Sequence, residues 1–339
     1  MEHIRQSNFE LMRILSMFLI IWYHIFIFVF EVDNPGQLWY KALQMPMHIG
    51  VPLFVMISGY FGIRFSFKSI LGGVISRLYV YAVPIALFIA IRTGGNMKDI
   101  INSFFVLGQH NFWFVNTYLC LYIVAPAITP WFDNANKRQR WITLIGLALF
   151  TIYTGNLKMT DPTLIDGKNL LNFIFIYFIG RMLNYYQDTL TKISSWKYIV
   201  TYVVLVMLSL FVFTNINNTY IQTRLWLLFY PYNSPMLLME SCIIFILFGK
   251  LQIQSGIINK IASSVFAMYI LHGAAFVYIA NTVRLLNSTT NDKNIQIILS
   301  FLLVVAIIIA STCIDRMFSP LWKYVSRQGQ KLDNWYNRN

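Results

Sequence analysis

Charged residues are scarce in this sequence, and acidic residues are the scarcest of them. Only 12% of the 339 residues are charged, with 13 Asp and Glu against 26 Lys and Arg, whereas 57% are hydrophobic. A soluble domain carries roughly 25% charged residues. This composition cannot supply a polar shell that faces water, but a lipid bilayer accepts apolar helix exteriors. The composition therefore excludes an ordinary soluble protein and indicates a membrane protein.

Cysteines are also few, and none of them forms a C-x-x-C pair. Cys120, Cys242 and Cys313 each lie inside an apolar run. Such spacing excludes a recognisable disulfide framework or zinc site, so we expect no metal ion and no permanently bound cofactor. The net charge of +13 comes from basic residues in short segments between apolar runs. Nucleic-acid binding would place them on a soluble surface, and we do not expect it.

Long apolar runs dominate the sequence instead. A membrane-spanning helix needs about 20 mostly apolar residues. The first run is too long for the core of a signal peptide and no small-residue cleavage site follows it, so it predicts an uncleaved first span. We predict an all-α, polytopic integral membrane protein with about ten transmembrane helices, at 11–30, 45–63, 78–92, 111–130, 141–155, 169–183, 197–214, 234–250, 261–282 and 294–315.

The distribution of Lys and Arg between these runs predicts the orientation. If the N-terminus is cytoplasmic, 18 of the 26 Lys and Arg residues fall on the inner side and the other 8 on the outer side. This bias follows the positive-inside rule and favours cytoplasmic N- and C-termini. We expect one transmembrane domain over residues 1–320. The basic and aromatic tail, residues 321–339, is typical of an anchor at the cytoplasmic membrane surface.

Four ionisable residues inside the predicted spans are candidates for function, because such residues are costly in a membrane. They are Arg13, His24, Glu240 and His272. Arg13 and His24 are eleven residues apart, which on a helix is a rise of about 16 Å and a rotation that leaves them about 20° apart. One helix face would then carry a cation near the cytoplasm and an imidazole further out. The alternative is that Arg13 extends its charged end to the inner membrane surface and that His24 is a hydrogen-bonded core residue.

A histidine in this position suits acid–base chemistry. A neutral imidazole can accept a proton from an attacking hydroxyl, and a nearby carboxylate can orient it. We therefore predict His24 as a catalytic residue that either deprotonates the attacking hydroxyl directly or helps form an acyl-enzyme, with Glu240 as its partner. Glu240 could instead be a polar clamp between helices, and a structural role is slightly favoured for His272.

A second group of residues surrounds the inner end of the second span. The segment VPLFVMISGYF contains Ser58 and Gly59, and the glycine would allow close approach of another helix or a ligand. The following loop carries Arg64, Lys68 and Arg77, which with Arg13 would suit a phosphate-rich ligand. Charges that only determine topology are the alternative.

Several segments together resemble the acyltransferase-3 family of membrane O-acyltransferases. NFELMRILSMFLIIWYH resembles the first span of that family, including its Arg-x10-His spacing, and PLFVMISGYF resembles its F-x-x-x-S-G-[FY] segment. FWFVNTYLCLYIVAP, which begins just before Trp113, resembles its Trp-Phe segment, and SSVFAMYILHG resembles its S-x-x-x-Y-x-x-H segment. The four segments occur in the family's order along nearly the whole chain.

The resemblance implies a ten-span fold that transfers an acyl group, usually acetyl, from cytoplasmic acyl-CoA to a hydroxyl of a cell-surface or exported glycan or its lipid-linked precursor. It implies that His24 is catalytic and that Arg13 belongs to the donor site. Arg77, Lys68, Ser58, Trp113 and His272 are further substrate-binding candidates.

The sequence departs from the family at the R-x-x-R pair that often follows the second span, since Val74 stands three residues before Arg77. No SGNH hydrolase-like domain is present, so the chain is similar to the stand-alone form found with polysaccharide assembly proteins. We expect a bacterial cytoplasmic membrane location, with membrane lipid and assembly proteins as partners.

Two other functions fit a multi-span protein with buried polar residues. A transporter or flippase for a glycan intermediate could use His24 and Glu240 for proton coupling. A structural subunit of an assembly complex would need neither residue. Binding of acyl-CoA would distinguish the enzyme from both.

Overall fold

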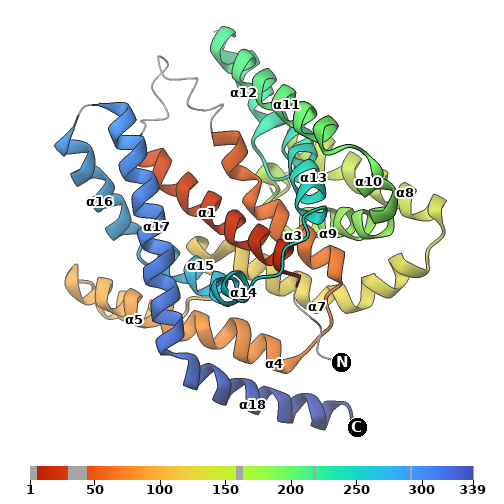
Figure 1. The fold of residues 1–339 in the computed structure, drawn as a ribbon. Coiled ribbons are helices and arrows are strands. Elements are labelled where there is room, and N and C mark those ends of the chain that lie inside the picture. The colour runs from red at the N-terminus through yellow and green to blue at the C-terminus, as the bar shows by residue number, and fades with distance from the viewer. Residues whose placement is uncertain (1–5, 30–43, 158–162, 217–218, 291, 339) are drawn as a thin grey trace. The chain divides into compact units, whose positions relative to one another are not determined.

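The structure is a computed structural model that describes residues 6–29, 44–157, 163–216, 219–290 and 292–338 (Figure 1). These residues form helices joined by loops, and no β-strand occurs among them. The prediction of an all-α fold is therefore confirmed. Arg5, Phe30, Lys41 and Lys158, which the topology prediction used, lie outside the described residues.

The chain forms two compact units, and the first unit is built from two separate segments, Met1–Ile63 and Thr117–Asn259. Its helices are α1 (Ser7–Val29), α3 (Gly50–Phe61), α7 (Trp113–Asn134, from Thr117 onward), α8 (Lys137–Ala148), η4 (Leu149–Leu157), η5 (Ile165–Gly167), α9 (Leu170–Tyr185), α10 (Gln187–Lys192), α11 (Ser195–Asn215), α12 (Thr219–Phe229), α13 (Pro235–Gly249) and the start of α14 (Gly256–Ala262).

The second unit consists of Arg64–Asn116 and Lys260–Asn339. Its helices are α4 (Phe67–Ser69), η2 (Ile70–Ile75), α5 (Ser76–Arg92), α6 (Met97–Asn102), η3 (His110–Phe112), the first turn of α7, the end of α14, α15 (Val265–Ala274), α16 (Phe276–Thr289), α17 (Lys293–Met317) and α18 (Ser319–Tyr336).

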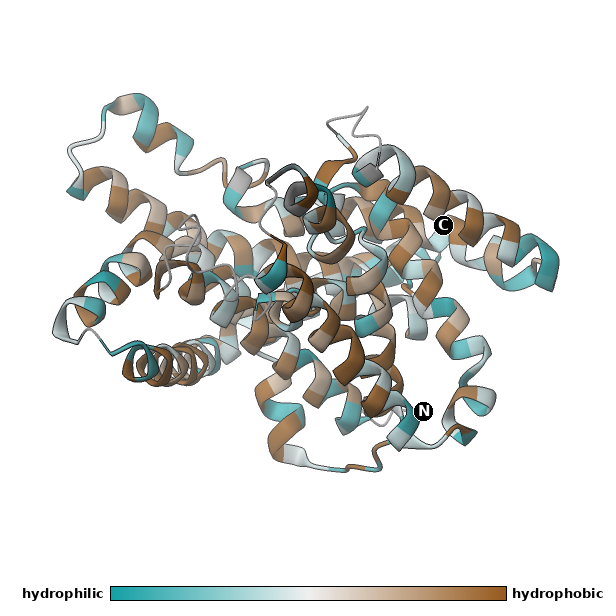
Figure 2. Cartoon of the chain, turned by 90° about the horizontal axis from the view of Figure 1, so that it is seen from above, coloured by the Kyte–Doolittle hydropathy of each residue, from teal (hydrophilic) through white to brown (hydrophobic). Residues whose placement is uncertain are grey.

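Six helical segments of the described chain are long and apolar enough to cross a membrane, and apolar residues cover most of the ribbon (Figure 2). The six are Ser7–Val29, Phe67–Arg92, Trp113–Asn134, Ser195–Asn215, Gly256–Ala274 and Lys293–Met317. On α11, Val203, Met207 and Phe211 are each more than half exposed, and lipid can cover such side chains. The chain is a multi-pass membrane protein. The count of ten spans and the orientation remain predictions.

Two glycines hold α3 against α9 in the first unit. A Cβ added to Gly59 would lie 2.0 Å from the Tyr177 carbonyl oxygen, and one added to Gly180 would lie 2.3 Å from that of Met56. Small residues allow helix backbones to approach closely, which favours helix association in membranes. The expectation that Gly59 allows another helix to approach is thus confirmed.

Two helix boundaries differ from the sequence expectation, and one helix was not expected. The helix expected at 78–92 begins at Phe67, because the Ser66 side chain accepts a hydrogen bond from Ser69 N and the π-helix η2 continues the chain into α5. The span expected at 261–282 is interrupted between α15 and α16 at Ala275, just after the weak helix former Gly273. Helix α12 was not predicted.

The predicted topology can be tested by labelling single cysteines in a variant from which Cys120, Cys242 and Cys313 have been removed. A cysteine in the 133–140 loop should react only from the cytoplasmic side, and one in the 156–168 loop only from outside. Residues 158–162 of that loop lie outside the described residues. Labelling of both loops from one side would contradict the ten-span arrangement.

Candidate active site

Helix α1 carries both Arg13, which is predicted to bind the acyl donor, and His24, which is predicted to be catalytic. Arg13 and His24 lie in one uninterrupted helix, so the expected rise of about 16 Å between them applies. Arg13 Nη1 donates a 2.8 Å hydrogen bond to Glu10 Oε1, one turn earlier. Sequence analysis overlooked Glu10, although its spacing of three residues from Arg13 is the signal for such a pair. The ion pair fixes the direction of the guanidinium.

Tyr118 contacts Ser58, the serine of the second predicted span, and lies near Arg13. Ser58 Oγ lies 2.9 Å from the Tyr118 hydroxyl and also donates to the Phe54 carbonyl oxygen at 3.0 Å. The charge of Arg13 acts on the same Tyr118 ring. Helices α1, α3 and α7 therefore bring two predicted site residues, Arg13 and Ser58, into one polar neighbourhood of the first unit.

A group of aromatic rings lies beside His24. The His24 ring centroid is 5.5 Å from that of Tyr23, and the Tyr23 ring meets His48 edge-on at 4.2 Å. His48 Nδ1 lies 3.0 Å from the Tyr230 carbonyl oxygen, and the imidazole stacks on Tyr232. Because Nδ1 faces a carbonyl, it carries the ring proton when His48 is neutral, and Nε2 is left as an acceptor.

His48 is the main residue that sequence analysis overlooked. It lies within the run at 45–63, so the signal that drew attention to His24 and His272 applied equally to it. Its Nε2 is buried and has no hydrogen-bond partner among the described residues, and the same is true of the Tyr230 hydroxyl. Buried polar groups normally have partners, so these two atoms are available to a hydroxyl-bearing ligand or to water.

Glu240 is fully buried in α13. Its two carboxylate oxygens accept no hydrogen bond from any residue that the structure describes. The structure thus puts Glu240 and His24 in the same unit but does not join them by a hydrogen bond.

The other four predicted site residues belong to the second unit, and the most firmly held of them is Arg77. Its Nε donates to Asp315 Oδ1 at 3.1 Å, and Nη1 donates to the carbonyl oxygens of Gly72 and Gly73 at 3.0 and 3.3 Å. A π-turn leaves carbonyl groups without their usual helical partners, and Arg77 supplies hydrogen bonds to two carbonyls of η2. The guanidinium also lies 4.9 Å from the Trp322 ring centroid.

These contacts predict that Arg77 mainly stabilises the second unit. Arg77→Lys should lower the free energy of unfolding by about 1–3 kcal/mol, because one ammonium cannot reproduce the spread of contacts made by the guanidinium. Thermal unfolding of the purified variant would measure this. Arg92→Lys, at the exposed end of the same helix, is the matched control. Unchanged melting with weakened acyl-CoA binding would instead place Arg77 in the donor site.

The remaining residues of the second unit have separate surroundings. Lys68 is exposed on α4, beside α18. Trp113 is half-buried at the start of α7. His272 is buried, with Nδ1 2.9 Å from the Met268 carbonyl oxygen of its own helix and its ring against Tyr269. This intrahelical contact is what a structural histidine would make.

A family model described as an acyltransferase domain, that of the acyltransferase-3 family, matches residues 6–315. The matched segment contains all eight predicted site residues. No curated protein matches the chain, and no solved structure matches it. The family match favours acyl transfer over the transporter and structural-subunit alternatives.

Proposed function

Because the chain belongs to the acyltransferase-3 family and is a membrane acyltransferase, we propose that it moves an acyl group, most simply acetyl, from cytoplasmic acyl-CoA to a hydroxyl of a cell-surface or exported polysaccharide or its lipid-linked precursor. The membrane is the bacterial cytoplasmic membrane, and polysaccharide assembly proteins supply the acceptor. The observation that carries this proposal is the placement of Arg13 and His24 on one face of α1 within the matched segment.

The donor lies along α1. The Arg13 guanidinium contacts a phosphate or amide of the CoA moiety. The Glu10 carboxylate holds that guanidinium in position. The pantetheine arm follows the helix for about 16 Å, the rise between Arg13 and His24, and brings the thioester to the imidazole. A donor that enters from the cytoplasm and reacts near the other side of the membrane can acylate a glycan outside the cell.

His24 acts as the general base in a direct transfer. One imidazole nitrogen accepts the proton of the acceptor hydroxyl while that oxygen attacks the thioester carbonyl carbon. The tetrahedral intermediate then expels the CoA thiolate as the carbon–sulfur bond breaks. The imidazolium of His24 returns its proton to the sulfur, so the products are an ester and CoA, and the histidine is regenerated.

The acceptor occupies the polar and aromatic surroundings of His48. Its Nε2 and the Tyr230 hydroxyl can each bond a sugar hydroxyl, and the ring of Tyr23 lies between His24 and His48. Tyrosine rings suit the apolar faces of a sugar while leaving its hydroxyls to polar atoms. Glu240, which is fully buried in the same unit, is the proposed carboxyl partner of His24.

The test is the mass of the surface polysaccharide from wild-type cells and from cells that lack this chain. We expect the wild-type repeat unit to be heavier by one acyl group, and mild alkali, which cleaves esters, to abolish the difference. Complementation with the His24→Gln variant should leave the mass at the deletion value. Identical masses before alkali treatment would overturn the proposed acceptor.

A further inference from the structure

A basic groove of about 360 Å³ lies between α4 and the C-terminal helix α18 of the second unit. Six side chains line it, of which three are cationic and none is acidic. They are those of Lys68, Trp322, Lys323, Ser326, Arg327 and Gln330. Residues 322, 323, 326, 327 and 330 repeat at spacings of three and four, which places them on one face of α18. A concave surface with charge of one sign attracts a ligand of the opposite sign, so the groove favours an anion.

The groove lies where two candidate membrane spans end. The segment Phe67–Arg92 begins at α4, and α17 ends at Met317, two residues before α18 begins. Helix α18 contacts both α4 and α17, and it runs across the end of α17 (Figure 1). Because α18 directly follows a candidate span and is itself too polar to be one, we expect it to lie along the membrane surface. The groove would then open at the depth of the lipid headgroups.

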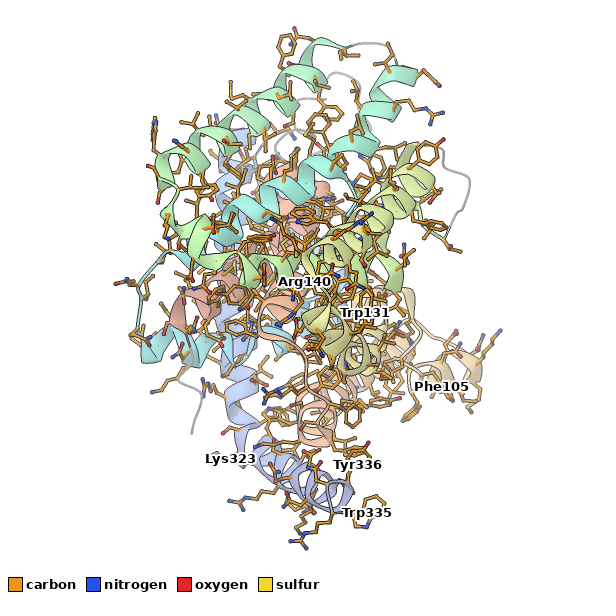
Figure 3. The ribbon with its side chains drawn as sticks, turned by 90° about the vertical axis from the view of Figure 1, so that its right-hand side faces the viewer. Phe105, Trp131, Arg140, Lys323, Trp335 and Tyr336 are labelled. Atoms are coloured by element: carbon orange, nitrogen blue, oxygen red, sulfur yellow. The ribbon has the colours of Figure 1, made fainter. Side chains whose placement is uncertain are left out.

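Helix α18 also carries exposed aromatic residues on the side away from the groove. Tyr324, Trp335 and Tyr336 are each at least 60% exposed. Figure 3 shows Lys323 on one side of α18 and Trp335 and Tyr336 on the other. Tyrosine and tryptophan are enriched at the membrane–water interface, and helices with one basic side and one aromatic or apolar side bind anionic lipid there. The two sides of α18 therefore favour a position at the headgroups.

Helix α18 is fixed closely against α4, which gives the groove a defined shape. A Cβ added to Gly329 would lie 2.6 Å from Lys68 Cα. The Asp333 carboxylate accepts hydrogen bonds from Phe67 N, Lys68 N and Ser66 Oγ, at 2.6, 3.1 and 2.9 Å. The backbone of Lys68 is thereby held beside the basic face of α18.

Most of the positive charge in the groove is not neutralised by the protein. No ion pair joins Lys323 or Arg327 to a carboxylate of the described residues. Asp333 attracts Lys68, but its oxygens are held by the hydrogen bonds from α4. Asp315, the other carboxylate that the second unit places beside α18, accepts from Arg77 Nε at 3.1 Å. Two cations therefore remain available to a ligand.

We propose that this groove binds the headgroup of an anionic phospholipid, with Lys323 and Arg327 on the two unesterified oxygens of its phosphodiester. A guanidinium and an ammonium both suit such oxygens. A lipid is favoured over a soluble phosphate because anionic lipid is concentrated at the membrane surface, where we place the groove. The site goes beyond acyl transfer and does not depend on it, and α18 lies outside the matched residues 6–315.

The experiment uses the purified full chain in detergent micelles and the double variant Lys323→Gln, Arg327→Gln. Both side chains are exposed, so the variant should fold and, without anionic lipid, melt like wild type. Phosphatidylglycerol is titrated into each protein, and bound lipid is counted by native mass spectrometry. We expect the apparent Kd to rise about thirtyfold, since each basic residue near an anionic membrane surface is worth about a fivefold change in affinity.

The matched control removes the same charge outside the groove. Lys331→Gln, Arg338→Gln changes two exposed cations of the same C-terminal region that do not line it. At physiological ionic strength the apparent Kd should stay within about twofold of wild type, because exposed charges more than about 8 Å from the ligand are largely screened. An equal loss of affinity in the two double variants would show that the whole tail attracts lipid diffusely and would overturn the groove.

A second measurement tests stability and a soluble occupant. A ligand that binds only the folded chain stabilises it, so phosphatidylglycerol should raise the melting temperature of wild type and of the control, but not that of the groove variant. No rise in wild type would contradict the proposal. Inorganic pyrophosphate is then added to wild type that holds phosphatidylglycerol. Displacement of the lipid at micromolar pyrophosphate would show that the groove takes a soluble phosphate instead, whereas retention of the lipid supports the proposal.

Discussion

Replacing His24 with glutamine should reduce acyl transfer by about 10²–10⁴-fold, the usual cost of losing a general base. Glutamine keeps much of the volume and can still form hydrogen bonds, but it cannot accept a proton at neutral pH. Because His24 is half-buried on a helix whose other face packs in the core, the variant should insert and melt like wild type. The measurement is transfer from labelled acetyl-CoA by purified protein, at matched amounts of folded enzyme.

Substitutions of two other buried polar residues serve as comparisons for His24→Gln. His272→Gln is the same substitution in a histidine whose Nδ1 contacts its own helix, and its effect should be much smaller. Glu240→Gln should also cost less than His24→Gln, because no hydrogen bond joins the carboxylate to a described residue. Activity of the His24→Gln enzyme within a few-fold of wild type would remove His24 from the mechanism.

Substituting Gly59 with alanine should cost the protein much of its stability. The added Cβ would lie 2.0 Å from the Tyr177 carbonyl oxygen, which is backbone and cannot rotate away. The helices α3 and α9 would have to separate, and overpacking of this kind costs about 1–3 kcal/mol or more. We expect a lower melting temperature in detergent and less protein in the membrane.

The matched control for this prediction is Gly146→Ala in α8. A Cβ at Gly146 would meet nothing within 4 Å, and alanine is the better helix former. Its melting temperature should equal or exceed that of wild type. If both alanine variants melt alike, the close contact between α3 and α9 does not contribute to stability.

Much of the fold could be predicted from the sequence because it depends on local composition. Every predicted span overlaps a helix, since an apolar run in a membrane must satisfy its backbone hydrogen bonds internally. The close approach at Gly59 was also predictable, because a glycine in an apolar helix commonly marks a packed face. These properties are encoded over a few neighbouring residues.

The parts that could not be predicted depend on residues far apart in the chain. Arg77 finds its carboxylate in Asp315, 238 residues away. The basic and aromatic composition of the tail predicts a membrane anchor, which stays a prediction, and the tail's Trp335 and Tyr336 are exposed (Figure 3). Its docking on α4 depends on where Gly329 and Asp333 meet Lys68 and its neighbours, and a single sequence does not reveal that pairing.

The interleaving of the two units along the chain has a consequence for biosynthesis. Helix α3 packs on α9 through Gly59 and Tyr177, which are 118 residues apart, and all of the segment Arg64–Asn116 is made in between. At the usual 5–20 residues per second, α3 waits roughly 6–24 s for its partner after it leaves the ribosome. During that interval its glycine face is open to lipid and to the helices of other proteins. Insertion factors that shield small-residue faces would therefore matter more for this chain than for one whose neighbouring helices pair in order of synthesis.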